Sequence, residues 1–250
     1  MSGHSKWSQI KRQKGANDAK RGALFTKVAR EITIAAREGG ADPDANYRLR
    51  LAMEKARAVN MPADNIKRAV ERASGGAAAE QYEEIIYEGY GPGGVAILVE
   101  AATDNRNRTV ADVRSLFTRA GGQLAGSGAV AWQFEPRGVV VVPRDGQDPD
   151  DVALTAIDAG ADDVDVEGDP IEILTDPARL ETLRRTLEEQ GVTVESAEVA
   201  MQPKNAIEVD ENVARQNLRL LESLEDLDDV QRVTANFDLP AEILAEAAAS

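Results

Sequence analysis

The first thirty residues hold the side chains best suited to binding chemistry. They carry eight positive charges against a single acid, Asp18. The cations are Lys6, Lys11, Arg12, Lys14, Lys20, Arg21, Lys27 and Arg30. Cations at this density neutralise phosphates and release counterions, which predicts strong, mostly sequence-independent binding to nucleic acid. Trp7 lies among them, and it either stacks on an unpaired base, worth ~1–3 kcal/mol, or packs against a helical core.

Charge is divided unevenly along the chain, whose net charge is −15. Residues 1–76, the basic head, hold 16 basic and 8 acidic residues, a net charge of +8. Residues 77–250, the acidic body, hold 13 basic and 36 acidic residues, a net charge of −23. This division favours a polyanion that touches the head, while the body repels it or engages a basic protein. The alternative is that segregated charge aids solubility and orients the domains.

A second candidate lies in the polar sequence TDNRNRT of the body. Arg106 and Arg108 could extend from it as a second contact point for phosphates, because loops at the ends of sheets commonly carry function. The alternative is a capping role, in which Thr109 caps the helix that follows and Asp104 or Asn105 fixes the loop.

Enzymatic chemistry is poorly supported. The chain has no cysteine, and its one histidine, His4, lies in residues 1–15, which we interpret as a flexible arm. The glycine-rich stretch 89–94 precedes an expected strand and lacks a Lys-Ser/Thr pair, which indicates a turn. A calcium loop starting at Asp163 would need Glu at its twelfth position, where Leu174 stands. We therefore expect no catalysis, no metal, no cofactor and no small-molecule substrate.

The sequence also bears on location. It contains no run of eighteen apolar residues and no apolar stretch typical of a secretory signal near its start. We expect a cytoplasmic protein that does not contact a membrane.

Three helices are expected in the head. The first follows Asn17 and Asp18 and ends at Gly39 and Gly40, with Lys20, Lys27, Arg30 and Arg37 on a side away from its apolar stripe. That stripe is Leu24, Val28, Ile32 and Ala35. The other two helices are expected over 44–59 and from Pro62 to about Gly75.

The body alternates strand-like and helix-like segments, which predicts an α+β fold. Expected strands are 84–87, 94–102, 164–167, 171–175, 194–201, 207–209 and 230–236. Two more are expected around a turn at Pro136-Arg137-Gly138, one before it and one after it. Expected helices are 110–120, 149–159, 177–189 and 213–224. Residues 138–204 form a β-α-β-β-α-β run typical of a ferredoxin-like domain. We expect that domain to be inserted in a second one built from 77–137 and 205–240, with 1–76 as the helical domain.

Five segments resemble the YebC family, in order and over essentially the whole chain. They are GHSKW, DAKRGALFTKVAREITIAAREGG, NMPADNIKRA, EGYGPGGVAILVEAATDNRNRT and GGQLAGSGAVAWQFE. The resemblance implies a three-domain crescent, with an all-α first domain and two α+β domains. The family is usually described as probable transcriptional regulators that bind DNA. It also includes a mitochondrial translational activator of cytochrome oxidase, and bacterial relatives are connected to translation at the ribosome, notably at proline-rich stretches.

The prediction is therefore an α+β multidomain protein that binds nucleic acid and regulates gene expression without catalysis. The resemblance favours a DNA-binding transcriptional regulator. The alternative is a translation factor that binds ribosomal RNA and relieves ribosome stalling.

Overall fold

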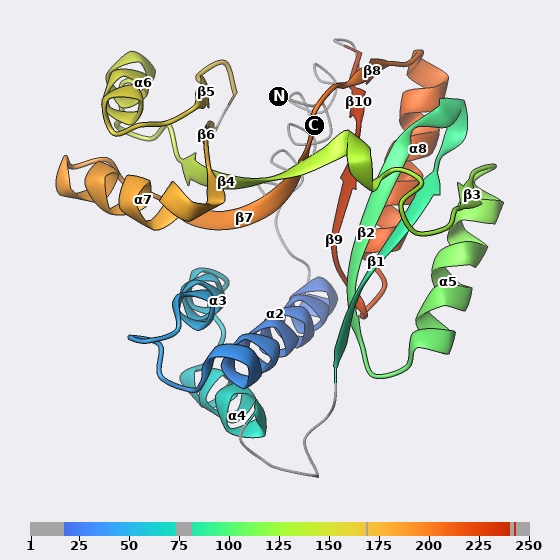
Figure 1. The fold of residues 1–250 in the computed structure, drawn as a ribbon, viewed down its shortest axis with the longest axis horizontal. Coiled ribbons are helices and arrows are strands. Elements are labelled where there is room, and N and C mark those ends of the chain that lie inside the picture. Colours follow the sequence, from blue (N-terminus) through green and yellow to red (C-terminus); the bar gives the residue numbers. More distant parts are fainter. Residues whose placement is uncertain (1–17, 74–81, 169, 241–242, 244–250) are drawn as a thin grey trace.

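The computed structural model describes residues 18–73, 82–168, 170–240 and 243. It consists of a helical head and a body with two four-stranded sheets, drawn at the bottom, right and left of Figure 1. The predicted α+β multidomain class is confirmed. The predicted arm, residues 1–15, lies outside the described residues.

The described part of the head, residues 18–73, consists of three helices. Its helices are α2 (Asp18–Gly39), α3 (Tyr47–Ala58) and α4 (Ala63–Ala73). The predicted stripe of α2 is buried at Val28 and Ile32, which pack against Leu49 of α3. Helix α3 begins later than expected because Asn46 is its N-cap and accepts a hydrogen bond from the Leu49 amide at 3.0 Å.

The first sheet of the body has the order β3-β1-β2-β9. Its elements are β1 (Glu83–Tyr90), β2 (Ala96–Thr103), β3 (Gln123–Leu124) and β9 (Val230–Ala235), with α5 (Arg106–Arg119) and α8 (Glu211–Glu225) on one face (Figure 1). Alternation along β2 explains this layering, since Val99 faces Phe117 and Leu221 of the helices. Leu98 faces the other way, onto Phe134. A short parallel pair, β8 (Ile207–Glu208) and β10 (Phe237–Asp238), lies beside this unit.

The second sheet has the order β5-β6-β4-β7, with antiparallel neighbours throughout. Its elements are β4 (Phe134–Val142), α6 (Pro149–Asp158), β5 (Asp163–Asp165), β6 (Ile171–Thr175), α7 (Leu180–Glu189) and β7 (Ser196–Pro203), with 3-10 turns at Ala131–Gln133 and Pro177–Arg179. This order is that of a ferredoxin-like β-α-β-β-α-β unit. In sequence it lies between β3 and β9 of the first sheet. The domain limits given above stay a prediction.

One sequence prediction in this region is wrong. The segment around Pro136-Arg137-Gly138 is not a turn, because β4 continues through it and pairs with β7 from Phe134 to Val141. Proline is compatible with this strand because β6 pairs with β4 only from Gly138 onward, so one edge of β4 has no ladder at Pro136. The long β4–β7 ribbon connects the two sheets (Figure 1).

The glycine-rich stretch is a turn between strands, as predicted. A 3-10 turn over Pro92–Gly94 connects β1 to β2, and the Gly91 amide donates to the Val95 carbonyl at 2.8 Å. Gly93 and Gly94 have φ of 72° and 79°, which glycine adopts without strain. No helix in the described part of the chain is both long and apolar enough to cross a bilayer.

Candidate nucleic-acid interface

The structure describes the side chains of four of the eleven predicted site residues: Lys27, Arg30, Arg106 and Arg108. Lys6, Trp7, Lys11, Arg12 and Lys14 lie outside the described residues, as do the side chains of Lys20 and Arg21. Each of the four described cations has a partner within the protein.

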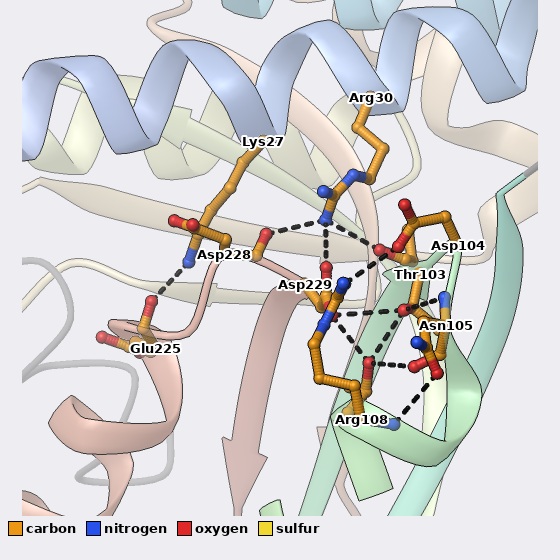
Figure 2. Close-up of polar contacts among 11 residues, drawn as sticks. Lys27, Arg30, Thr103, Asp104, Asn105, Arg108, Glu225, Asp228 and Asp229 are labelled. Carbon is orange, nitrogen blue, oxygen red and sulfur yellow. Dashed lines mark hydrogen bonds and ion pairs between the residues drawn. The ribbon is translucent and has the colours of Figure 1, made fainter. Parts of the chain in front are cut away.

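Arg30 is buried between the head and the body, although the sequence places it on the polar side of α2. Its side chain leaves α2 and ends against the body (Figure 2). Nη1 donates to the carbonyls of Ala102 and Asp228, both at 2.8 Å, and pairs with Asp229 Oδ1 at 3.1 Å. The guanidinium also lies 4.8 Å from the centre of the Tyr82 ring. Arg30 is 9% exposed, and Asp229 balances its charge inside the molecule.

Asp229 is the common hydrogen-bond acceptor where the head meets the body (Figure 2). Besides Arg30, its carboxylate accepts hydrogen bonds from Arg108 at 2.8 Å, Thr109 at 2.7 Å and Thr103 at 3.2 Å. Burial alone would raise the pKa of Asp229, but the hydrogen bonds from Arg108 and Thr109 and the nearby charges of Arg30 and Arg108 hold it below its ordinary value. We call these five residues the Asp229 cluster, and we conclude that it fixes the head to the body.

The TDNRNRT loop combines capping with surface charge. Asn105 is the N-cap of α5 and accepts from the Arg108 amide at 3.1 Å, so the prediction that Asn105 fixes the loop is confirmed. The prediction that Thr109 caps the helix is wrong, because Thr109 lies inside α5 and is buried in the Asp229 cluster. Arg108 also pairs with Asp104 at 2.9 Å. Arg106 is 65% exposed and lies 3.5 Å from Glu83, which leaves its guanidinium at the surface.

Further cations of the head face acids or carbonyls of the body. Lys27 of α2 donates to the Glu225 carbonyl (Figure 2). The other contacts of this kind are Arg37 to the Tyr82 carbonyl, Arg48 to Glu84, Arg50 to Glu181 and Lys55 to Glu198. The division of charge along the sequence is therefore partly neutralised within the molecule, where it orients the head against the body.

A different side of the head carries cations that the sequence analysis did not single out. Arg57, Lys67, Arg68 and Arg72 are exposed on α3 and α4, and we call them the outer face. Helix α4 lies at the lower edge of the molecule in Figure 1. The side chains of Arg57 and Arg72 make no hydrogen bond or ion pair with other residues in the described ranges. Arg57 and Lys67 flank a groove of about 340 Å³ with an apolar floor of Met53, Ile66 and Val70. The spacing of Lys67, Arg68 and Arg72 on one polar helix side could have indicated this surface from sequence.

Metal chemistry has no visible site in the same ranges. Among the described residues, no group of three or more His, Cys, Asp or Glu side chains is placed to hold a metal ion.

The fold and the interface together define a class of protein: a basic helical head docked on an acidic body of two α+β units. Two family descriptions match the chain in the same order. The TACO1/YebC protein N-terminal domain matches residues 5–76, and the TACO1/YebC second and third domain matches residues 82–237. The chain belongs to the TACO1/YebC family, which confirms the resemblance found in the sequence.

Individual relatives are similar over nearly their whole length. A probable transcriptional regulatory protein of Rubrobacter xylanophilus is 54% identical over 249 residues, which cover 99% of this chain and 100% of the relative. One of Chloroflexus aurantiacus is 56% identical over 248 residues, 98% of each chain. A conserved hypothetical protein from Aquifex aeolicus, known from a crystal structure, is 46% identical in sequence. The two structures superpose with a TM-score of 0.86 over 91% of this chain and 94% of that one.

Proposed function

We propose that this chain regulates gene expression by binding nucleic acid with its basic head, without catalysis. Two relatives carry the name probable transcriptional regulatory protein, which supports the regulatory part. One observation supports the binding part. The cations of the head that face the body are paired there, whereas Arg57 and Arg72 on the outer face have no partner among the described residues.

The proposed interface joins the arm and the start of α2 to the outer face. It comprises Lys6, Trp7, Lys11, Arg12, Lys14, Lys20 and Arg21 together with Arg57, Lys67, Arg68 and Arg72. Arginine suits this role because its planar guanidinium binds phosphate oxygens in pairs. Lys27, Arg30 and Arg108 serve instead to hold the head on the body. Arg106, exposed at the start of α5, is a further phosphate contact on the body.

The target is proposed to be DNA, in line with the names of the relatives, and RNA is the competing outcome. The full chain is titrated into labelled duplex DNA and into labelled single-stranded RNA of mixed sequence, and fluorescence anisotropy gives the affinity at several salt concentrations. We expect binding that weakens steeply with salt. Tighter binding to RNA at every salt concentration would redirect the proposal to a translation factor, and no binding to either would contradict it.

Matched variants locate the interface. Arg57→Gln with Arg72→Gln removes two charges from the outer face, and Arg179→Gln with Arg185→Gln removes two from exposed, ion-paired positions on the second sheet unit. The first pair should lower the slope of log affinity against log salt by roughly 1.4 to 1.8, at ~0.7–0.9 per phosphate contact. The second pair should leave it unchanged. Equal losses from both pairs would mean that net charge alone governs binding.

A further inference from the structure

Most basic side chains of the acidic body are paired. Arg144 and Lys204 donate to the carbonyls of Val166 and Trp132. Eight others pair with acids: Arg106 with Glu83, Arg108 with Asp229, Arg137 with Glu135, Arg179 with Asp162, Arg184 with Glu181, Arg185 with Glu189, Arg215 with Glu211 and Arg232 with Glu198. Arg114, Arg119 and Arg219 are the remainder, and they make no ion pair with any residue that the structure describes.

These three arginines are exposed on the same two helices, α5 and α8. Two of them line one groove of about 540 Å³ between the helices, on the side of the sheet that Figure 1 shows at the right. The groove residues used here are Arg119, Arg219, Gln216 and Ser223, above an apolar floor of Leu116 and Leu220. None of the described residues that line the groove is acidic.

Two neighbouring arginines without an ion pair are unexpected in a body with 36 acidic and 13 basic residues. Elsewhere in the body, eight of the thirteen cations do pair with acids. Arg119 has a local explanation, since it lies in the last turn of α5, where a cation interacts favourably with the helix dipole, and its Nε donates to the Ser115 carbonyl at 3.4 Å. Arg219 lies in the middle of α8, so that explanation does not cover it.

Two guanidinium groups beside an amide and a hydroxyl form a suitable site for a phosphate group. Guanidinium binds phosphate through two parallel hydrogen bonds, and Gln216 adds an amide donor to the same groove. Helix α5 also connects this groove to Arg106. Its 14 residues span about 20 Å, so a strand bound at both ends would follow the helix.

We propose that the α5–α8 groove binds a phosphodiester group of the nucleic acid through Arg119 and Arg219. This inference rests on the proposed function, because it assigns an additional phosphate contact to the same ligand. It places that contact on the acidic body, at a distance along α5 from the exposed Arg106.

The first experiment tests the groove as an anion site independently of nucleic acid. Inorganic pyrophosphate is titrated into the full-length, ¹⁵N-labelled chain, and the backbone amides of Gly121 and Ser223 are followed by NMR. We expect saturable shifts that are lost in the Arg119→Gln/Arg219→Gln variant and kept in the Arg179→Gln/Arg185→Gln control. Absence of saturable shifts in the wild-type chain would overturn the site.

The second experiment tests the nucleic acid as its occupant. In the anisotropy titration, the Arg119→Gln/Arg219→Gln variant should lower the salt slope by roughly 1.4 to 1.8, and the control pair should not. An unchanged slope in the groove variant, with a lowered slope in the outer-face variant, would overturn this inference and leave the proposed function standing. Saturable pyrophosphate binding by a chain that binds no nucleic acid would reject the proposed function and the phosphodiester occupant, but keep the anion site.

A third measurement distinguishes a protein occupant. Labelled poly-glutamate is offered to the same full-length proteins. If the groove variant lost affinity for poly-glutamate and kept its affinity and slope for nucleic acid, the occupant would be an acidic protein segment, and the inference would be overturned. Because Arg119 and Arg219 are exposed, the melting temperature should fall only slightly in the variant, through the lost contact of Arg119 with the end of α5, which checks that the fold is intact.

Discussion

Two pairs of arginines have opposite surroundings, although each pair has one member on helix α5. In the Asp229 cluster, Arg30 and Arg108 meet a buried carboxylate that also accepts two hydroxyl groups. In the α5–α8 groove, Arg119 and Arg219 meet no acid among the described residues. The comparison shows that the partner of a cation, and not its place in a basic segment, decides whether it stabilises the fold or is available to a ligand.

The same contrast divides the head. Its body-facing side uses Arg30, Arg48 and Arg50 for contacts with the body, while Arg57 and Arg72 on the outer face have none in the described ranges. Removing a cation or its partner should therefore change stability on the first side and binding on the second. The following predictions test that division, from the largest expected effect to the smallest.

Asp229→Asn should have the largest effect on stability. It removes the charge that compensates the buried Arg30, and breaking one partner of a buried pair costs about 3–5 kcal/mol. Urea unfolding of the full chain, followed by circular dichroism, measures the loss. Asp228→Asn is the matched control, because its side chain is exposed and the Asp228 carbonyl that accepts from Arg30 remains. Similar losses in both variants would show that the cluster does not hold the head.

Glu88→Gln should have the next largest effect. The buried Glu88 carboxylate accepts from the amides of Gly128, Val130 and Ala131 at 2.6, 2.7 and 2.8 Å. A glutamine offers one acceptor oxygen and turns an NH₂ group toward the remaining donors, so we expect a loss of about 1–3 kcal/mol in unfolding free energy. Glu208→Gln, at an exposed position, should change it little. Equal unfolding midpoints for the two variants would contradict the role given to Glu88.

Acid should weaken the fold through these two carboxylates. Burial would raise the pKa of Glu88, but its three backbone hydrogen bonds hold the pKa below the ordinary 4.5, and the pKa of Asp229 is held below 3.8. Their stabilisation is therefore complete above those ordinary values and is lost as pH falls through the lowered, folded-state values. The unfolding free energy, measured from pH 6 downward, should fall less steeply in Glu88→Gln and Asp229→Asn than in the wild-type chain.

Glu100 provides a check, because its pKa is shifted in the opposite direction to those of Glu88 and Asp229. Burial raises its pKa above 4.5, so its contribution is greatest in acid and is lost as pH rises through the raised value. Glu100→Gln should therefore not flatten the loss of stability in acid. A flattened profile in that variant would mean that the acid response does not come from the Asp229 cluster and Glu88.

Arg106→Gln should have the smallest effect on stability. Its ion pair with Glu83 is exposed and 3.5 Å long, and such pairs contribute ~0–1 kcal/mol. The salt slope for nucleic acid should nevertheless fall by ~0.7–0.9 if Arg106 contacts one phosphate. The two measurements are thermal unfolding and anisotropy. A lower melting temperature with an unchanged salt slope would mean that Arg106 stabilises the fold and does not contact a phosphate.

Local patterns in the sequence predicted the elements well where the cause is local. The stripe that includes Val28 and Ile32 located α2, and the glycines at 39 and 40 located its end. Strands were expected on both sides of Pro136-Arg137-Gly138, but the continuity of β4 through these residues could not be predicted. They are typical of a turn, and only the pairing with β7 and the late start of β6 permit a strand there.

The site was harder to predict, because pairing between distant segments decides it. Arg30 and Arg57 look alike in sequence, yet docking of α2 on the body buries one, and the other stays at the surface. Glu88 is another example, since its strand sequence gives no sign that a loop forty residues later folds over its carboxylate.

The central claim is that the head binds nucleic acid with the cations that the body does not neutralise. The most direct test is the salt slope of nucleic-acid binding in the full chain after Lys11, Arg12 and Lys14 are replaced by Ala, compared with Arg108→Gln. We predict a fall of about 2 to 3 in the slope for the triple variant, at ~0.7–0.9 per phosphate, with no change for Arg108→Gln. Unchanged affinity and slope in the triple variant would contradict the account.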